Sequence, residues 1–94
     1  MTFFLFGKYS SESIKEADAQ RTEQALKIVA ELGGKVKGMY ALLGTYDLVF
    51  ILEMKSLELV MKVSVELTAL TGISFTSYPA ISVSDFDRLL GELA

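Results

Sequence analysis

The sequence predicts an α+β domain of the ferredoxin-like type, a four-stranded antiparallel βαββαβ sheet with two helices on one face and a further C-terminal helix. One observation behind this is the order of the segments, in which β-prone runs and segments of helical composition follow one another as strand, helix, strand, strand, helix, strand. The other is size, because 94 residues, 51% of them hydrophobic, suit a single domain over residues 1–94 with a real core.

In the first half of the chain, glycines separate the predicted elements. The opening strand is rich in aromatic residues, and the helix that follows ends at Gly33, a typical helix stop. Gly44-Thr45 separates the two central strands, because two residues with glycine first suit a tight type II′ hairpin turn. The expected elements are a strand at 2–9, a helix at 11–32 and strands at 35–43 and 46–53.

The second half is bounded by capping residues. Ser56 is the N-cap candidate of the second long helix, and Gly72 lies just beyond the end of that helix. Ser84 is the N-cap candidate of the last helix. The strand that precedes this helix contains Pro79, which predicts an irregularity there. The expected elements are a helix at 56–70, a strand at 73–83 and a helix at 84–93.

Apolar side chains are expected on both faces of the sheet. A two-residue turn sets the pairing of the two central strands, and successive pairs alternate between the two faces. One face carries Leu43 with Tyr46, Ala41 with Leu48, Met39 with Phe50 and Lys37 with Leu52. The other face carries Leu42 with Asp47, Tyr40 with Val49 and Gly38 with Ile51. The first strand likewise directs Phe3 and Leu5 to one side and Phe4 and Phe6 to the other. A half-solvated antiparallel strand would alternate apolar with polar residues, so both faces need cover.

Two arrangements would cover the face that the two helices leave open. The terminal helix would fold back as a lid through Phe86, Leu89, Leu90 and Leu93, or a second subunit would pack there. We favour the second arrangement, because an exposed apolar patch of this size is unusual on a monomer. The sequence therefore predicts a homo-oligomer that is at least a dimer.

Composition excludes several classes of function. Without His or Cys there are no imidazole or thiolate metal sites, no disulfides, no Ser-His-Asp triad and no usual haem ligand, so we expect neither metal nor cofactor. A net charge of −3 argues against a nucleic-acid partner. The sequence shows no signal peptide and no apolar run of roughly 18 residues, so we expect a cytoplasmic protein with no membrane partner.

Several segments resemble the GYD-domain family. They are GKYS at 7–10, ELGGKVKGMY at 31–40, GTYDLVFILE at 44–53 and SDF at 84–86. In the third segment, Gly44, Tyr46 and Asp47 match the Gly-x-Tyr-Asp-like motif of the family. The resemblance spans nearly the whole chain. It implies a domain of the dimeric α/β-barrel type in a small bacterial or archaeal protein, and it supplies no established activity.

The C-terminal half is also similar to the effector-binding domain of Lrp/AsnC-type regulators. In that family a G-x-Y-D turn and a T-G-I-like turn help form a ligand pocket at a subunit contact, and here Gly44, Tyr46 and Asp47 and the run 71–73 match them. The chain has no helix-turn-helix segment, so this resemblance implies a stand-alone amino-acid or metabolite-sensing module. A small cofactor-free dimeric-barrel enzyme is a further alternative, although no pair of carboxylates is clearly placed for acid–base catalysis.

Arg21 marks the candidate ligand site. On a helical wheel it lies near the middle of the apolar stripe formed by Ile14, Ala17, Ala25, Ile28 and Leu32. A structural role, in which Arg21 snorkels to water or pairs with a carboxylate, would also explain this position. The topology brings the ends of several elements together, so we expect a pocket that binds a small anionic metabolite, with Arg21 and Asp47 in direct or one-water contact. The residues expected there are Lys8, Tyr9, Arg21, Tyr46, Asp47 and Gly72.

Overall fold

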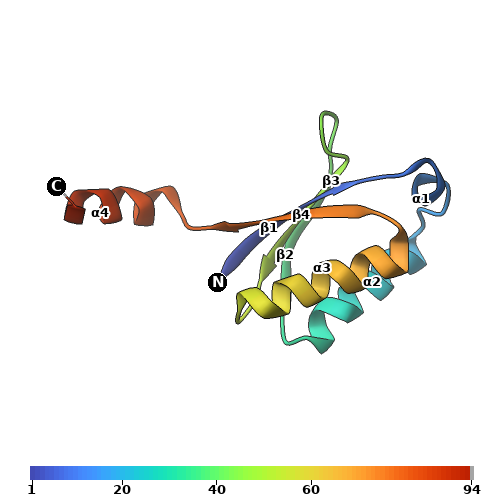
Figure 1. The fold of residues 1–94 in the computed structure, drawn as a ribbon, viewed down its shortest axis with the longest axis horizontal. Helices are drawn as coiled ribbons and strands as arrows, with labels where there is room; N and C mark the ends of the chain where they lie inside the picture. Colours follow the sequence, from blue (N-terminus) through green and yellow to red (C-terminus); the bar gives the residue numbers. More distant parts are fainter. Residues whose placement is uncertain (94) are drawn as a thin grey trace.

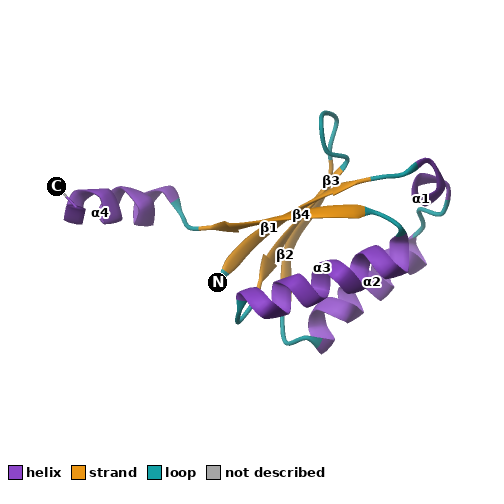
Figure 2. Ribbon diagram, in the orientation of Figure 1, coloured by secondary structure: helices purple, strands orange, loops and turns teal. Residues whose placement is uncertain are grey.

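In the computed structural model, which describes residues 1–93, helices cover one face of a four-stranded antiparallel sheet (Figures 1 and 2). The strand order is β2-β3-β1-β4, which gives the predicted ferredoxin-like arrangement. No helix within residues 1–93 has both the length and the apolar character needed to cross a membrane. The elements are β1 (Thr2–Lys8), α1 (Ser11–Lys15), α2 (Ala19–Glu31), β2 (Lys35–Ala41), β3 (Leu48–Glu53), α3 (Leu57–Thr71), β4 (Ser74–Ala80) and α4 (Val83–Leu93).

The core lies between the sheet and the layer formed by α2 and α3. Alternate residues of β1 and β3 point toward these helices, as the period of two in a strand requires. The fully buried side chains of this layer are Phe3, Leu5, Leu52, Val29, Val60, Val63 and Leu67. The predicted split of β1 is confirmed, because Phe3 and Leu5 are buried whereas Phe4 and Phe6 lie on the opposite face.

The first helix was predicted as one element over 11–32, and this is wrong. The chain forms α1 and then restarts as α2 at Asp18, whose Oδ1 accepts a hydrogen bond from Arg21 N at 2.7 Å. Such a local side-chain bond offers the backbone an alternative to a continuous helix. As a result Ile14 is 50% exposed and Ala17 is also exposed, so the apolar stripe runs through α2 only.

The pairing of β2 with β3 follows the prediction except near the start of β2. Met39 pairs with Phe50, and Gly38, Tyr40 and Ala41 also have their predicted partners. The predicted pair of Lys37 with Leu52 is wrong, because an irregularity between Val36 and Gly38 brings Val36 opposite Leu52.

The connection between β2 and β3 is a longer loop and not the predicted two-residue turn. Strand pairing stops at Ala41 and Leu48, beyond which Leu42 N donates to Asp47 O at 2.7 Å. The loop projects from the end of the sheet (Figure 1). Tyr46 was predicted to share a face with Met39 and Phe50, which the helices cover, and this is wrong. Its ring instead packs on Phe6, 5.1 Å between centroids, on the other face.

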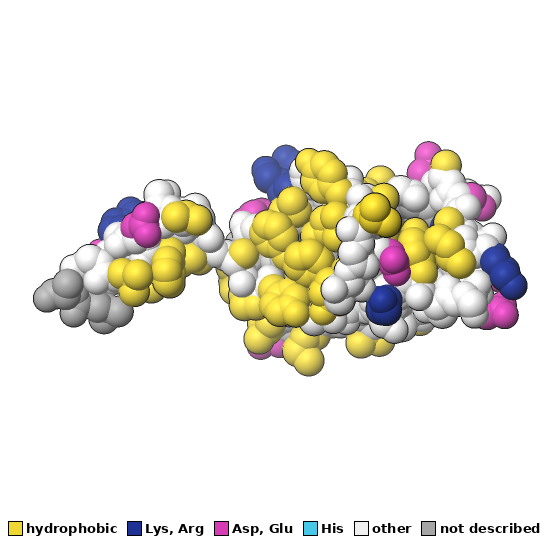
Figure 3. Space-filling view, turned by 90° about the horizontal axis from the view of Figure 1, so that it is seen from above, with side chains coloured by type: hydrophobic (Ala, Val, Ile, Leu, Met, Phe, Trp, Pro, Cys, Tyr) yellow, Lys and Arg dark blue, Asp and Glu magenta, His cyan; other side chains and the backbone are white. Residues whose placement is uncertain are grey.

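That other face, which we call the open face, carries apolar side chains that no element within residues 1–93 covers (Figure 3). Its register partners and ring contacts define it as Phe4, Phe6, Tyr40, Tyr46, Val49, Ile51 and Tyr78. Tyr40 is 60% exposed and Tyr78 is 45% exposed. The expectation of a second apolar face is therefore confirmed.

The terminal helix α4 continues away from the sheet after β4, so the lid alternative does not describe this structure (Figure 1). Its N-cap is Ser82 and not the predicted Ser84, because Ser82 Oγ accepts from Asp85 N at 3.0 Å. The predicted role of the Leu93 side chain lies outside the described residues.

Candidate functional site

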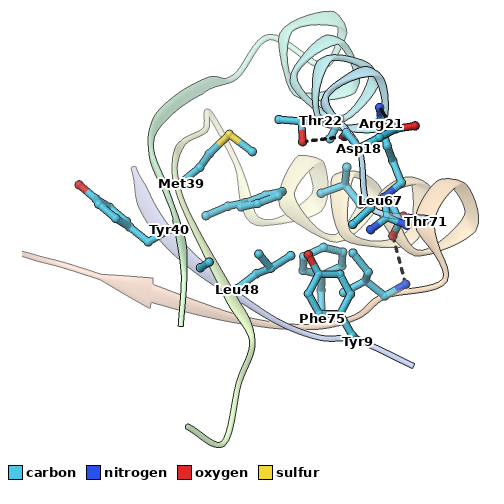
Figure 4. Close-up of a pocket in the computed structure, with 15 residues that line it drawn as sticks. Tyr9, Asp18, Arg21, Thr22, Met39, Tyr40, Leu48, Leu67, Thr71 and Phe75 are labelled. Atoms are coloured by element: carbon cyan, nitrogen blue, oxygen red, sulfur yellow. Dashed lines mark hydrogen bonds between the residues drawn. The ribbon is translucent and has the colours of Figure 1, made fainter. Parts of the chain in front are cut away.

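A cavity of about 230 Å³ lies between the helix layer and one end of the sheet (Figure 4). The first turns of α2, the last turn of α3 and strands β2, β3 and β4 form its walls. Most of the lining is apolar, supplied by Ala17, Ala25, Met39, Leu48, Phe50, Leu67, Ile73 and Phe75. Asp18, Arg21 and Thr22 line the cavity at the start of α2, and further polar side chains come from Tyr9, Tyr40 and Thr71.

Arg21 is the cation of this cavity and is partly buried. Its Nη1 donates to Ser13 O at 2.7 Å, and its Cζ lies 5.9 Å from the centroid of the Tyr9 ring, within cation–π range. The two ion pairs found among residues 1–93 involve other residues, so no described carboxylate pairs with this guanidinium. A guanidinium carries five N–H donors, and most of these are free for a ligand.

Asp18 is the anion of the cavity, and the sequence analysis did not include it. Its carboxylate accepts from Arg21 N, and its carbonyl accepts from the Thr22 hydroxyl at 3.3 Å. Asp18 is exposed, so its carboxylate can still meet a ligand at the rim. An Asp immediately before the first turn of a helix is an N-cap signal, and the prediction of one helix over 11–32 leaves no place for such a cap.

Asp47 shapes the site from outside the cavity. Its Oδ2 accepts from Tyr9 N at 2.8 Å, and its own N donates to Gly7 O at 2.8 Å. These two bonds fix the β2–β3 loop to the end of β1. The Tyr9 ring that faces Arg21 is thereby held at the cavity wall, so the connection between Asp47 and Arg21 runs through Tyr9 and is not a direct ion pair.

Lys8 and Gly72 were also predicted in the site, and neither lines the cavity. Lys8 is exposed, and its Nζ donates to the carbonyl of Thr45 at 2.9 Å, which adds a third contact between β1 and the loop. Gly72 ends α3 in the left-handed conformation, with φ 73°, and its neighbours Thr71 and Ile73 line the cavity in its place. Of the six predicted residues, the structure places Tyr9 and Arg21 in the cavity wall.

Tyr46 belongs to the open face, where it interacts with a second phenol. The Tyr78 side chain, as its hydrogen-bond partner, lowers the pKa of Tyr46, and Thr76 and the charge of Lys8 lower it further. The same contact raises the pKa of Tyr78. Both rings pack against Phe6, with centroids 5.1 Å and 5.6 Å away.

Comparison with known proteins gives a family and a fold. The family model described as GYD domain matches residues 3–90. The crystal structure of the Mycobacterium tuberculosis Leucine response regulatory protein (LrpA) is similar to 86% of this chain, with a TM-score of 0.57 and 11% identity. The match covers 50% of that regulator, so this chain spans about half its length, and at this identity the likeness concerns the fold alone. No curated protein matches.

Proposed function

This chain belongs to the GYD-domain family, and we propose that it is a homo-oligomeric domain that binds a small organic anion. The apolar body of the ligand would fill the cavity, and its carboxylate or similar group would pair with Arg21. The observation that carries the proposal is the guanidinium itself, which is partly buried on the wall of an apolar cavity and has no carboxylate partner within residues 1–93.

The guanidinium is not placed as that of a snorkelling arginine would be. A snorkelling arginine directs its charge to water, whereas Arg21 donates to Ser13 O and lies over the Tyr9 ring. Removing a charge from water is costly unless a partner compensates it. A bound carboxylate would supply that partner through two parallel hydrogen bonds, the geometry that arginine favours.

The size and lining of the cavity favour a metabolite-sized ligand. Its volume of about 230 Å³ lies below the roughly 300–1,000 Å³ of pockets for drug-sized molecules. Leu67 and Phe75 belong to its apolar wall, where an aliphatic chain would pack.

Amino-acid sensing is a second candidate function, and Asp18 favours it. A zwitterion would place its carboxylate on Arg21 and its ammonium on Asp18, whose carboxylate lies at the same rim. The structural neighbour is named a Leucine response regulatory protein, which makes leucine a natural probe for this version of the proposal.

The open face supports the homo-oligomeric part of the proposal. Two of its aromatic side chains, Tyr40 and Tyr78, remain exposed in the single chain, at 60% and 45%, and the others are half-buried. A second copy that packs its own open face there would cover both apolar surfaces at once, as the symmetry of most dimers allows.

Calorimetric titration with three probes tests the ligand class. Leucine carries both charges, 4-methyl-2-oxopentanoate carries only the carboxylate, and isopentylamine carries only the ammonium. An anion site predicts binding of the oxo acid and no binding of the amine, whereas the amino-acid version predicts that leucine binds more tightly than the oxo acid. Arg21→Ala should weaken binding about 10- to 150-fold. This is the effect of losing a hydrogen bond to a charged group, which contributes about 1.5–3 kcal/mol.

Arg88→Ala is the matched control, since Arg88 is an exposed arginine on α4, away from the cavity. Light scattering should show that Arg21→Ala leaves the oligomer intact. If neither leucine nor the oxo acid binds at millimolar concentration, or if Arg21→Ala and Arg88→Ala bind equally well, the proposed anion site is wrong.

A further inference from the structure

We propose that α4 is an arm that packs on a second copy of this chain, beside the open face of that copy. The inference rests on the homo-oligomer proposed above and adds the segment that completes its interface. Three features of the structure support this inference: the apolar side of α4, the direction that this side faces, and the area that the sheet alone provides.

One side of α4 is apolar and has nothing to pack on in the single chain. Val83, Phe86, Leu89 and Leu90 recur at helical spacing and are 74%, 48%, 47% and 48% exposed. The helix has eleven residues, and isolated helices shorter than about 12–15 residues are only marginally stable in water. This helix therefore needs a surface that covers its apolar side.

The apolar side of α4 and the open face of the sheet point in the same direction. Figure 3 views the molecule from the side opposite α2 and α3, and the hydrophobic side chains of both the sheet and α4 are visible from there. A single partner lying over this side of the molecule would therefore contact both surfaces, with no change in the path of the chain.

The flat footprint of the sheet is smaller than the area that an ordinary specific interface buries. Four strands spaced about 4.8 Å apart, each about seven residues long at about 3.3 Å per residue, give a footprint of roughly 450 Å². Stable interfaces bury about 800 Å² per partner. An arm of eleven residues, about 16 Å long and about 10 Å wide, adds roughly a third to the sheet's footprint.

The other occupants of this surface fit less well. α4 cannot pack on the sheet of its own subunit, because only Ile81 and Ser82 separate it from β4 and the helix continues away from the sheet (Figure 1). An anionic membrane would favour a basic polar side, but the charged residues within Val83–Leu93 are three acidic and one basic. A second copy therefore fits best.

The experiment compares two double variants by sedimentation equilibrium. Phe86→Ser with Leu90→Ser removes the apolar side of α4, and Asp87→Ser with Glu92→Ser is the control on its polar side. Because both copies carry the change, the dimer Kd should rise about a thousandfold in the first variant and by less than tenfold in the control. Near-ultraviolet circular dichroism should show that the sheet and its aromatic contacts remain folded in both.

Cross-linking identifies where the arm lies. The chain has no Cys, so Leu89→Cys mixed with Tyr40→Cys should give a bismaleimide-linked heterodimer, whereas the double variant should not form a link within one chain. A wild-type monomer would overturn the arm together with the proposed homo-oligomer. If the wild type is a dimer and the Phe86→Ser, Leu90→Ser variant has the same Kd, the arm alone is overturned. A cross-link within one chain, or binding to anionic vesicles that depends on Phe86, would also overturn the arm alone.

Discussion

The carboxylate of Asp47 is expected to stabilise the whole end of the sheet beside the cavity. In the native chain Tyr9 N donates to Asp47 Oδ2 at 2.8 Å in a partly buried position. Asp47→Ala removes that acceptor and leaves the Tyr9 N–H without its partner, while the backbone bond from Asp47 N to Gly7 O remains. Losing a hydrogen bond to a charged group costs about 1.5–3 kcal/mol.

That loss is large for a domain of this size. A chain of 94 residues is expected to have an unfolding free energy of roughly 5–14 kcal/mol. A loss of about 2 kcal/mol should lower Tm by about 8–16 °C, since each kcal/mol shifts Tm by about 4–8 °C in domains of this size. Asp47→Asn keeps an acceptor but not the charge, so it should fall between Asp47→Ala and the wild type.

Urea denaturation monitored by circular dichroism measures these differences. Glu23→Ala is the control, because Glu23 is an exposed carboxylate on α2, and such surface changes stay within about 0.5 kcal/mol. If Asp47→Ala costs no more than Glu23→Ala, the carboxylate does not hold the end of β1. The account of how the Tyr9 ring is positioned would then be refuted with it.

Two further predictions concern pH. Hydrogen bonds from the N-terminal ammonium at 2.9 Å and from the Thr2 hydroxyl at 3.0 Å lower the pKa of Glu53. A depressed folded pKa stabilises the fold above the pKa of the unfolded chain, and the effect disappears as pH falls through the folded pKa. Thr2→Val should therefore raise the Glu53 pKa in an NMR titration and destabilise the fold at neutral pH only; an equal effect in acid would contradict this. On the open face, Tyr78→Phe should raise the pKa of Tyr46 and Tyr46→Phe should lower the pKa of Tyr78; unchanged ultraviolet titrations of the phenols would show that the two do not interact.

Features set by side-chain periodicity could be predicted from the sequence. The direction of a strand side chain alternates with a period of two, so the two apolar faces follow from Phe3 to Phe6 and from the pairing of Met39 with Phe50 without knowledge of the rest of the chain. The order of the elements, with right-handed crossovers, then favours the ferredoxin-like topology over the few alternatives.

The misses occur where a local hydrogen bond competes with the regular geometry. The Asp18 carboxylate restarts the helix by accepting from Arg21 N, and a backbone bond from Leu42 N to Asp47 O closes a longer loop in place of the tight turn. The difference between these arrangements and a continuous helix or a two-residue turn is of the order of 1 kcal/mol, the size of one capping bond. Glycine positions and hydrophobic period alone do not resolve a difference so small.

The candidate site shows how the backbone decides which partner a carboxylate takes. The topology correctly brings Asp47, Tyr9 and Arg21 to one end of the sheet, and opposite charges there suggested an ion pair. The last β1 residue paired in the sheet is Lys8, so the next N–H, that of Tyr9, has no strand partner. A partly buried N–H must be satisfied, and Asp47 accepts from it. With Asp47 engaged by the backbone, the guanidinium of Arg21 does not pair with it, as the proposed anion site requires.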